Sequence, residues 1–295
     1  MTTDQIRYFL EIGRCGSIIE AAKKLYITQP TLSRQIAGME SELGLKLFQR
    51  SRHGVQLTPA GETLYNQWST LADLYTKSVR EAAKSARGMT ESLSIGVLDG
   101  LKIDGFLPRF LFFLRNLRPD VHLILRRLSF AEIIEDIRSG RLDLAFSLDV
   151  NFFGHPELFV QNVKPYSSAI VVPARHPLAG KEKLTIADLK DETLVIVNRE
   201  ECEKGVEVIA DVCKKYGGFI PKFQYVPSMA NVLLWLESGL RCAILSMEIS
   251  LNESADAKVF PLAGASRSFV QMACSRSAEK SSVVMAKKYF AGQNL

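Results

Sequence analysis

Residues 17–36 decide the fold of the first part of the chain and read SIIEAAKKLYITQPTLSRQI. Ser17 followed by Glu20 is a capping-box pattern, which predicts that a short helix begins here. A tight turn at residues 26–28 follows. Gln29-Pro30 then open a longer helix, because a proline in the first turn removes an N–H that has no helical partner there. A short helix, a turn and a longer helix with a polar start are typical of a helix-turn-helix.

The longer helix, which we expect to end at Gly44, has one apolar and one polar face. The apolar positions repeat at helical spacing and are predicted to be buried: Leu32, Ile36, Met39 and Leu43. Near the helix start, the polar face carries side chains that suit the edges of DNA bases, since Arg pairs with guanine, Gln with adenine, and hydroxyl groups with either. We expect base contacts from this face, which presents Gln29, Thr31, Ser33, Arg34 and Gln35.

The flanking segments complete a small winged domain. Apolar residues at helical spacing predict a first helix from about Ile6 that ends around Gly13 to Gly16. Residues 47–57 predict two short strands around a turn at His53-Gly54. Arg50 and Arg52 belong to this wing, where they are placed for phosphates or a narrow minor groove.

A long helix follows the wing. Thr58-Pro59 is a helix start with a capping residue, and the pattern continues to about Gly88, a length of about 45 Å. Its apolar stripe is too long to be buried against one small domain, so we expect the helix to pair with a second copy of itself. The dimerisation residues predicted in this way are Leu64, Trp68, Leu71, Tyr75 and Val79.

The remaining two-thirds of the chain alternate between strands and helices, which is typical of open α/β sheets. The pattern forms two similar units, and two such units leave a cleft between them. The predicted strands are 93–97, 121–125, 142–146, 194–197, 223–226, 242–245, 259–262 and 269–274, and the predicted helices are 106–117, 129–140, 205–216, 229–237 and 278–290.

Ligands in such sheets bind beyond the carboxyl ends of strands, beside helix starts. Hydroxyl and cationic side chains at those places predict a small polar effector, such as an organic anion, held by Lys102, Ser129, Arg199 and Ser228. The two serines also suit simple helix caps, and the two cations also suit solvated loops, so both interpretations stay open.

Charge and composition point the same way. The first 90 residues carry twelve Lys and Arg against eight Asp and Glu, a net charge of +4 within a total of +5, which favours a polyanionic partner.

No apolar run is long enough to cross a bilayer and the N-terminus lacks a leader pattern, so we expect a cytoplasmic protein. The five cysteines form no C-x-x-C pair and the four histidines are scattered, so we expect neither a metal nor a cofactor.

Ile6–Glu62 resembles the winged helix-turn-helix of LysR-type transcriptional regulators. The matching residues are Phe9, Gly16-Ser17, Ala21-Ala22, Leu25, Thr28–Ser33, Gln35-Ile36, Glu40, Leu43-Gly44, Leu47-Phe48, Arg50, Leu57-Thr58 and Ala60-Gly61. By position, the resemblance assigns base contacts to Gln29, Pro30, Ser33 and Arg34. It assigns backbone or wing contacts to Thr31, Arg50 and Arg52.

The C-terminal part is similar to the effector-binding domain of the same family, through Leu128-Ser129, Gly140–Ala145, His176–Leu178 and Gly239-Leu240. The resemblance implies an all-α winged helix-turn-helix domain joined to a two-lobed α/β domain like the periplasmic binding proteins. It also implies a homodimer that assembles as a dimer of dimers on double-stranded operator or promoter DNA, with RNA polymerase as a candidate partner. The expected divisions are 1–58 (DNA binding), 59–88 (dimerisation helix) and 89–295 (effector binding), with lobe I at about 91–165 and 268–295 and lobe II at about 166–267.

Two other functions remain as alternatives. The first is a regulator that senses peroxide through two thiols. Cys202 is expected in the loop after a strand, and Cys213 is expected one helix later. Glu200, Glu201 and Glu203 oppose it, because they raise the free energy of a thiolate at Cys202. The other is an enzyme, which the absence of nucleophile-elbow, P-loop and dinucleotide-binding motifs makes the weaker reading.

Overall fold

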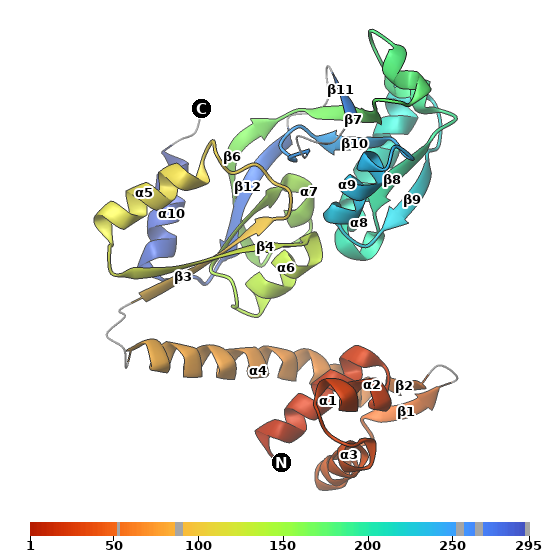
Figure 1. Ribbon diagram of the computed structural model, residues 1–295. Coiled ribbons are helices and arrows are strands. Elements are labelled where there is room, and N and C mark those ends of the chain that lie inside the picture. Colours follow the sequence, from red (N-terminus) through yellow and green to blue (C-terminus); the bar gives the residue numbers. More distant parts are fainter. Residues whose placement is uncertain (52–53, 86–90, 252–256, 263–267, 293–295) are drawn as a thin grey trace. The chain divides into compact units, whose positions relative to one another are not determined.

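The computed structural model describes residues 1–51, 54–85, 91–251, 257–262 and 268–292 of the chain (Figure 1). It divides into two compact units, Met1–Arg87 and Gly88–Leu295, and each is described by itself. No helix among the described residues is both long and apolar enough to traverse a bilayer.

The first unit contains four helices and a two-stranded hairpin among its described residues. In order they are α1 (Thr3–Cys15), α2 (Ile18–Lys24), α3 (Gln29–Leu43), β1 (Phe48–Ser51), β2 (Gly54–Leu57) and α4 (Pro59–Ser85). β1 and β2 pair antiparallel, with Arg50 opposite Val55. Helix α4 is described as far as Ser85, and the end predicted near Gly88 lies outside the described residues.

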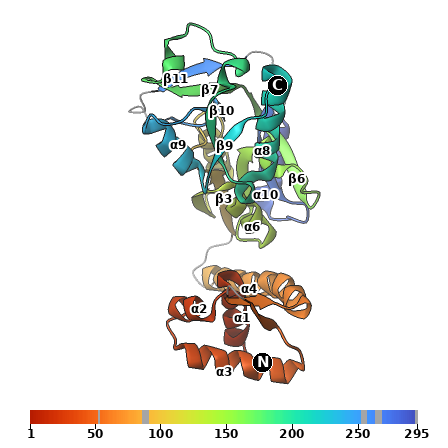
Figure 2. The same ribbon diagram turned by 90° about the vertical axis from the view of Figure 1, so that its right-hand side faces the viewer.

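Helix α1 lies between α3 and α4 and supplies the centre of the small core (Figures 1 and 2). Phe9, which is fully buried, contacts the ring of Phe48 on the wing at 5.3 Å between centroids and that of Trp68 on α4 at 5.5 Å. The apolar stripe predicted for α3 is confirmed at Leu32, Ile36 and Met39, which are buried. One aromatic side chain therefore joins the helical core to the wing and to the long helix.

The helix caps follow the sequence with one difference. Ser17 accepts the N–H of Glu20, as the capping-box pattern predicts, but the carboxylate of Glu20 contacts Lys23 at 2.8 Å instead of reaching back. Thr58 caps α4, since its hydroxyl accepts the N–H of Gly61 at 3.0 Å. Gly61 is required there, because a Cβ atom would overlap the carbonyl oxygen of Leu47.

Lobe I of the second unit is a five-stranded sheet of order β4-β3-β5-β12-β6. Its strands are β3 (Glu91–Leu98), β4 (Val121–Leu128), β5 (Leu144–Leu148), β6 (Leu158–Tyr166) and β12 (Ser268–Ser275). β3, β4 and β5 run parallel, whereas β12 pairs antiparallel with β5 and β6. In Figure 1, α5 (Leu107–Leu117) and α10 (Ser281–Ala291) cover one face, and α6 (Phe130–Arg138) and α7 (Asp149–Phe152) cover the other.

Lobe II is built from a three-stranded and a two-stranded sheet, of orders β10-β7-β11 and β8-β9. A parallel bridge between Leu194 and Cys242 joins them. The elements are β7 (Ser168–Pro173), 3₁₀ turns at Pro177–Gly180 and Ile186–Leu189, β8 (Thr193–Val197), α8 (Arg199–Val212), a π-helical turn at Cys213–Gly217, β9 (Lys222–Val226), α9 (Met229–Glu237), β10 (Ala243–Ser246) and β11 (Ala257–Pro261).

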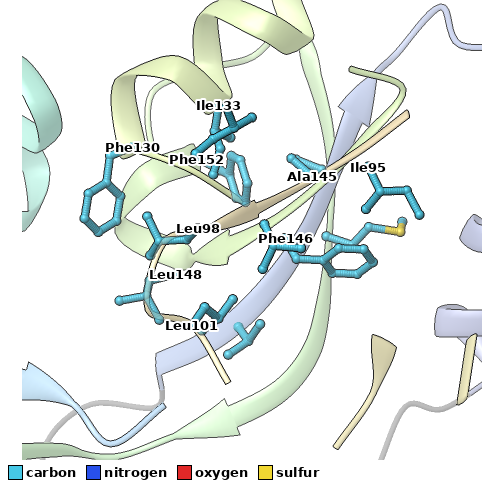
Figure 3. Close-up of a cluster of buried hydrophobic side chains, with 14 of the residues drawn as sticks. Ile95, Leu98, Leu101, Phe130, Ile133, Ala145, Phe146, Leu148 and Phe152 are labelled. Carbon is cyan, nitrogen blue, oxygen red and sulfur yellow. The ribbon is translucent and has the colours of Figure 1, made fainter. Parts of the chain in front are cut away.

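The core of lobe I lies between its sheet and its helices (Figure 3). Ile95 and Leu98 from β3, Phe146 and Leu148 from β5, and Phe130 at the start of α6 are all buried. Figure 3 shows Leu98, Leu148 and Phe130 together at one end of this cluster. Because Phe130 and Leu148 also line a cavity between the lobes, the core holds one wall of that cavity in place.

The sequence missed several elements of the second unit. β6, β7, the short helix α7 and the two 3₁₀ turns have no predicted counterpart, and α8 begins at Arg199 instead of Gly205. The prediction of Cys202 in a loop is therefore wrong, because this residue lies in the first turns of α8, with non-helical angles of φ −155° and ψ 84°.

Candidate nucleic-acid interface and effector cavity

The start of α3 presents polar side chains to solvent. Gln29, Pro30, Thr31 and Arg34 are exposed, while Ser33 is half-buried. The amide of Gln29 donates to the hydroxyl of Ser33 at 2.9 Å, and the hydroxyls of Thr28 and Thr31 lie 2.8 Å apart. The five predicted contact residues of this helix are thus brought together on its first two turns.

Tyr26 is an exposed aromatic residue beside this helix start that the sequence analysis did not single out. Its side chain is 95% exposed, and its backbone adopts φ +56°, the left-handed region that residues other than glycine rarely enter. Such a conformation raises the free energy of the folded state, so a turn with Asn or Gly would be more stable. The ring of Tyr26 therefore adds little to the packing of the domain, and no local sequence signal indicates its left-handed backbone.

The wing is held to α3 by a buried carboxylate. Glu40 is 8% exposed and accepts the N–H groups of Leu47 at 2.8 Å and Phe48 at 3.2 Å, while Lys46 donates to it at 2.6 Å. Burial alone would raise the pKa of Glu40, but these three hydrogen bonds outweigh it and hold the pKa below its ordinary value. Arg50 belongs to β1, next to this anchor, and Arg52 lies outside the described residues.

The stripe predicted for dimerisation on α4 divides into two parts. Leu64 and Trp68 pack against the core of their own domain. Leu71, Tyr75 and Val79 are 50%, 59% and 54% exposed, at a spacing of four residues. The first two residues of the stripe therefore pack within their own domain. The exposed apolar surface available to a second copy lies further along α4.

A cavity of about 100 Å³ lies between the lobes of the second unit. Lobe I contributes Phe130, Leu148 and Tyr166, whereas α8, α9 and the strands of lobe II form the opposite wall. The lobes also meet through main-chain bonds, from Lys102 N–H to the carbonyl of Glu248 and from Ser250 N–H to the carbonyl of Gly100, both 2.8 Å. These contacts hold the lobes together around the cavity.

The four predicted effector residues are not among the described residues that line this cavity. The Lys102 ammonium donates to the carbonyl of Met247 at 2.9 Å, and Arg199 is exposed, 3.7 Å from Glu203. Ser129 and Ser228 accept the N–H groups of Glu132 and Asn231 as helix caps. The next residues in the chain, Phe130 and Met229, line the cavity, so the two predicted serines lie at helix starts beside it without lining it.

The hinge between the lobes is fixed by Asp149. Its carboxylate accepts the hydroxyl of Tyr166 at 2.9 Å and the N–H of Phe269 at 3.0 Å. These two residues lie where β6 leaves lobe I and where β12 re-enters it. Burial, then the charge of Asp149 and the hydrogen bond to it, raises the pKa of Tyr166 well above its ordinary value, so this hydroxyl stays protonated and donates.

The geometry opposes a redox pair of Cys202 and Cys213. Both are buried, and burial raises the pKa of each thiol to about 11, to which the nearby charge of Glu201 also contributes at Cys202. They belong to α8 and the π-helical turn that continues it, so eleven residues at 1.5 Å each place them about 16 Å apart along the helix. A disulfide needs Cα atoms within about 7 Å, so this one requires unwinding of the helix.

His176, Glu192 and Cys242 form a cluster of possible metal ligands that the scattered sequence positions did not indicate, with ligand atoms within 4.8 Å of one another. Nδ1 of His176 accepts the N–H of Leu178 at 3.3 Å, which places the proton of a neutral ring on Nε2. That nitrogen lies 3.4 Å from Glu192. A hydrogen bond to the carboxylate explains this arrangement without an ion.

Two family models match the chain. Residues 3–62 match the bacterial regulatory helix-turn-helix of the lysR family, and residues 86–286 match the LysR substrate binding domain. AlsR of Bacillus subtilis (strain 168), an HTH-type transcriptional regulator, is 30% identical over 68% of this chain and 65% of its own length, so the match spans just under two-thirds of that relative.

Longer matches extend over nearly the whole sequence. TcbR of Pseudomonas sp. (strain P51), also an HTH-type transcriptional regulator, is 25% identical over 96% of this chain and 95% of its own. The crystal structure of CbnR, a LysR family transcriptional regulator, shares the fold with a TM-score of 0.68, at 20% identity over 99% of both chains. The predicted family and fold class are confirmed: the chain belongs to the LysR family of DNA-binding transcriptional regulators, with an effector-binding domain after its helix-turn-helix.

Proposed function

We propose that the chain reads an operator as a homodimer and that a small molecule held between the lobes changes this binding. The observation that carries the first part is the set of exposed hydrogen-bonding side chains on the first turns of α3, beside an exposed tyrosine. A helix with such a start fits the major groove, where base edges are read.

Within this interface, Arg34, Gln29, Ser33 and Pro30 contact base edges, with Arg34 as the principal source of discrimination. Thr31, Arg50 and Arg52 contact the backbone or the minor groove beside the wing. Tyr26 adds a hydroxyl that reaches a phosphate next to the recognition helix. CbnR, whose fold is similar, has been solved in full length complexed with its target DNA, which supports DNA as the partner.

The exposed stripe of α4 joins two copies of the chain. Leu71, Tyr75 and Val79 recur at i, i+4 and i+8, so they form one apolar face that a second α4 would bury. Two such dimers combine into a dimer of dimers on promoter DNA, where RNA polymerase is a further partner. Residues 1–58 bind DNA, 59–88 dimerise and 89–295, in two lobes, bind the effector.

The effector occupies the cavity between the lobes and acts by favouring one arrangement of them. Any such ligand shifts an equilibrium only through different affinities for the two arrangements. The main-chain bonds around Lys102 and Ser250 are the contacts that such a shift would make or break. The protein acts in the cytoplasm, as a regulator and not as an enzyme.

A footprint tests the central claim. The full-length protein is incubated with DNA from upstream of its own gene and with a shuffled duplex. We expect two protected half-sites with centres about 34–36 Å apart, one helical turn, and a preference of about 10³ or more over the shuffled DNA. A monomer in sedimentation that binds both duplexes equally would overturn the proposal.

A further inference from the structure

The cavity between the lobes is lined by uncharged groups. Its described walls are aliphatic and aromatic, apart from the hydroxyls of Tyr166, Ser168, Ser246 and Ser268 and the thiol of Cys202. Three of these hydroxyls have partners in the protein. Tyr166 donates to Asp149, and Ser246 accepts the N–H of Glu248. Ser268 hydrogen-bonds to Tyr166. No described lining residue is Lys, Arg, Asp or Glu, so a charged ligand would find no opposite charge in these walls.

The helix start next to the cavity is already occupied by carboxylates. Glu132 accepts the N–H of Ser129 at 2.8 Å, and Glu201, which reaches across from lobe II, accepts the N–H of Ala131 at 3.4 Å. The exposed N–H groups of a helix start ordinarily attract anions. Here two glutamates of the protein take that place, at the beginning of α6.

The fixed charges around the cavity would repel an anion. Asp149 precedes Val150 and Glu201 precedes Cys202, and both of these neighbours line the cavity. The Asp149 carboxylate is held by Tyr166 and Phe269 at the hinge. An anionic ligand would therefore lose water without gaining a cationic partner, in the field of two carboxylates.

We infer that the effector of this protein is a small uncharged molecule with an apolar body and one or two hydroxyl or carbonyl groups. This inference rests on the proposal that the cavity is the effector site, and it differs from the organic anion that the sequence suggested. An apolar cavity of about 150 Å³ takes up benzene, so about 100 Å³ suits a molecule of about four or five non-hydrogen atoms. Serine hydroxyls in the wall would bind its polar group.

The test compares four probes of about five non-hydrogen atoms, matched to that volume: butan-2-ol, butan-2-one, propanoate and butylammonium. Dissociation constants for the full-length protein are measured by saturation-transfer NMR. We expect the alcohol and the ketone to bind about tenfold or more tightly than either ion. Binding of propanoate as tight as that of butan-2-ol, or binding of none of the four, would overturn the inference.

Variants connect the binding to the cavity. Val208→Phe fills it and should abolish binding of the uncharged probes, whereas Val284→Phe on α10, the same change at an exposed site, should leave it unchanged. Ser168→Lys places a cation in the wall and should bring propanoate into the cavity, which keeps the test decisive if Val208→Phe does not fold.

The outcomes separate the inference from the proposed function. Tight propanoate binding that Val208→Phe abolishes would leave the cavity as the effector site and refute only the uncharged ligand. Binding of butan-2-ol that persists in Val208→Phe would instead place the site elsewhere and refute the proposed location, and with it the inference.

Discussion

The buried carboxylate of Glu40 on the recognition helix accepts the N–H of Leu47, at the base of the wing, at 2.8 Å. The two parts of the DNA interface are thus connected by a single side chain through hydrogen bonds to an ionised group, which are stronger than neutral ones. A change at Glu40 should loosen the wing relative to α3 without altering any residue that we propose to contact DNA.

We expect Glu40→Ala to lower the free energy of unfolding of the first unit by about 1–3 kcal/mol, because it leaves two buried N–H groups without an acceptor. Trp68 and Trp235 are the two tryptophans of the chain, so a Trp235→Phe background lets the fluorescence of Trp68 follow this unit in a urea titration. Glu42→Ala, on the same helix but exposed, is the control and should change the value by at most about 1 kcal/mol.

The carboxylate of Glu40 should also make the free energy of unfolding depend on pH. The folded pKa of Glu40 lies below its ordinary value of 4.5, so its contribution is complete above that pH and is lost as the pH falls through the folded pKa. Glu40→Gln removes this titration and should flatten the stability curve on the acid side. Parallel curves for the wild type and Glu40→Gln below pH 4.5 would contradict the role of the ionised group.

Tyr26→Asn should separate folding from DNA binding. Asn tolerates the left-handed backbone at φ +56°, so the free energy of unfolding should stay level or rise by up to about 1 kcal/mol. Affinity for operator and random DNA should fall together, by about fivefold, if the phenol contacts a phosphate. Titration calorimetry of folding-competent variants measures both duplexes, and Tyr26→Phe tests the hydroxyl alone. Undiminished affinity in both variants would exclude the contact.

The sequence predicted the DNA-binding unit more completely than the effector unit, for physical reasons. The caps at Ser17 and Thr28, the proline at the start of α3 and Gly44 at its end are local signals that act within a few residues. The core stripe of α3 follows from helical periodicity alone. Local signals could not show the left-handed backbone at Tyr26, because this conformation is set by the packing of α2 against α3.

The effector cavity depends on contacts between distant parts of the chain. Ser129 and Ser228 were recognised as helix starts, but which side chain points inward depends on how the lobes close, through bonds such as that from Lys102 to Glu248. Strand β6 was not predicted because the proline at position 165 and polar residues interrupt its apolar pattern. Strand β7 has a continuous apolar run, which periodicity alone does not distinguish from a buried helical segment. Burial of a strand in a sheet outweighs the low strand propensity of individual residues such as proline.

Arg34→Ala should reduce discrimination between operator and random DNA by about 1–3 kcal/mol, because a bidentate contact to guanine is lost. Arg52→Ala should weaken both duplexes alike and lower the salt dependence of binding by about one unit of slope. Arg7→Ala, an exposed arginine of α1 paired with Asp4, is the control and should do neither. Fluorescence anisotropy at several salt concentrations gives all three results. Equal loss of discrimination at positions 34 and 52 would refute the assignment.

Leu71→Glu and Val79→Glu should each dissociate the dimer, since both residues are half-exposed in the free chain and would face a partner helix. Like charges across that interface should weaken the dimer by tenfold or more, about 1.4 kcal/mol at the least. Sedimentation equilibrium measures the change. Asn66→Glu introduces the same side chain at an exposed position on the opposite face of the helix, five residues before Leu71, and should leave the dimer intact. A dimer as tight as that of the wild type in both stripe variants would move the interface away from α4.

Cys202 and Cys213 should resist oxidation in the native protein. With the pKa of each raised to about 11 by burial, the reactive thiolate is a very small fraction at neutral pH, and the helix keeps the two sulfur atoms apart. After mild peroxide, mass spectrometry of the trypsin-digested protein should find both thiols unmodified and unlinked. The same treatment in urea serves as the control and should oxidise both, since unfolding exposes them. A Cys202–Cys213 disulfide formed in the native protein, together with a change in operator affinity that Cys202→Ser abolishes, would instead establish a redox sensor.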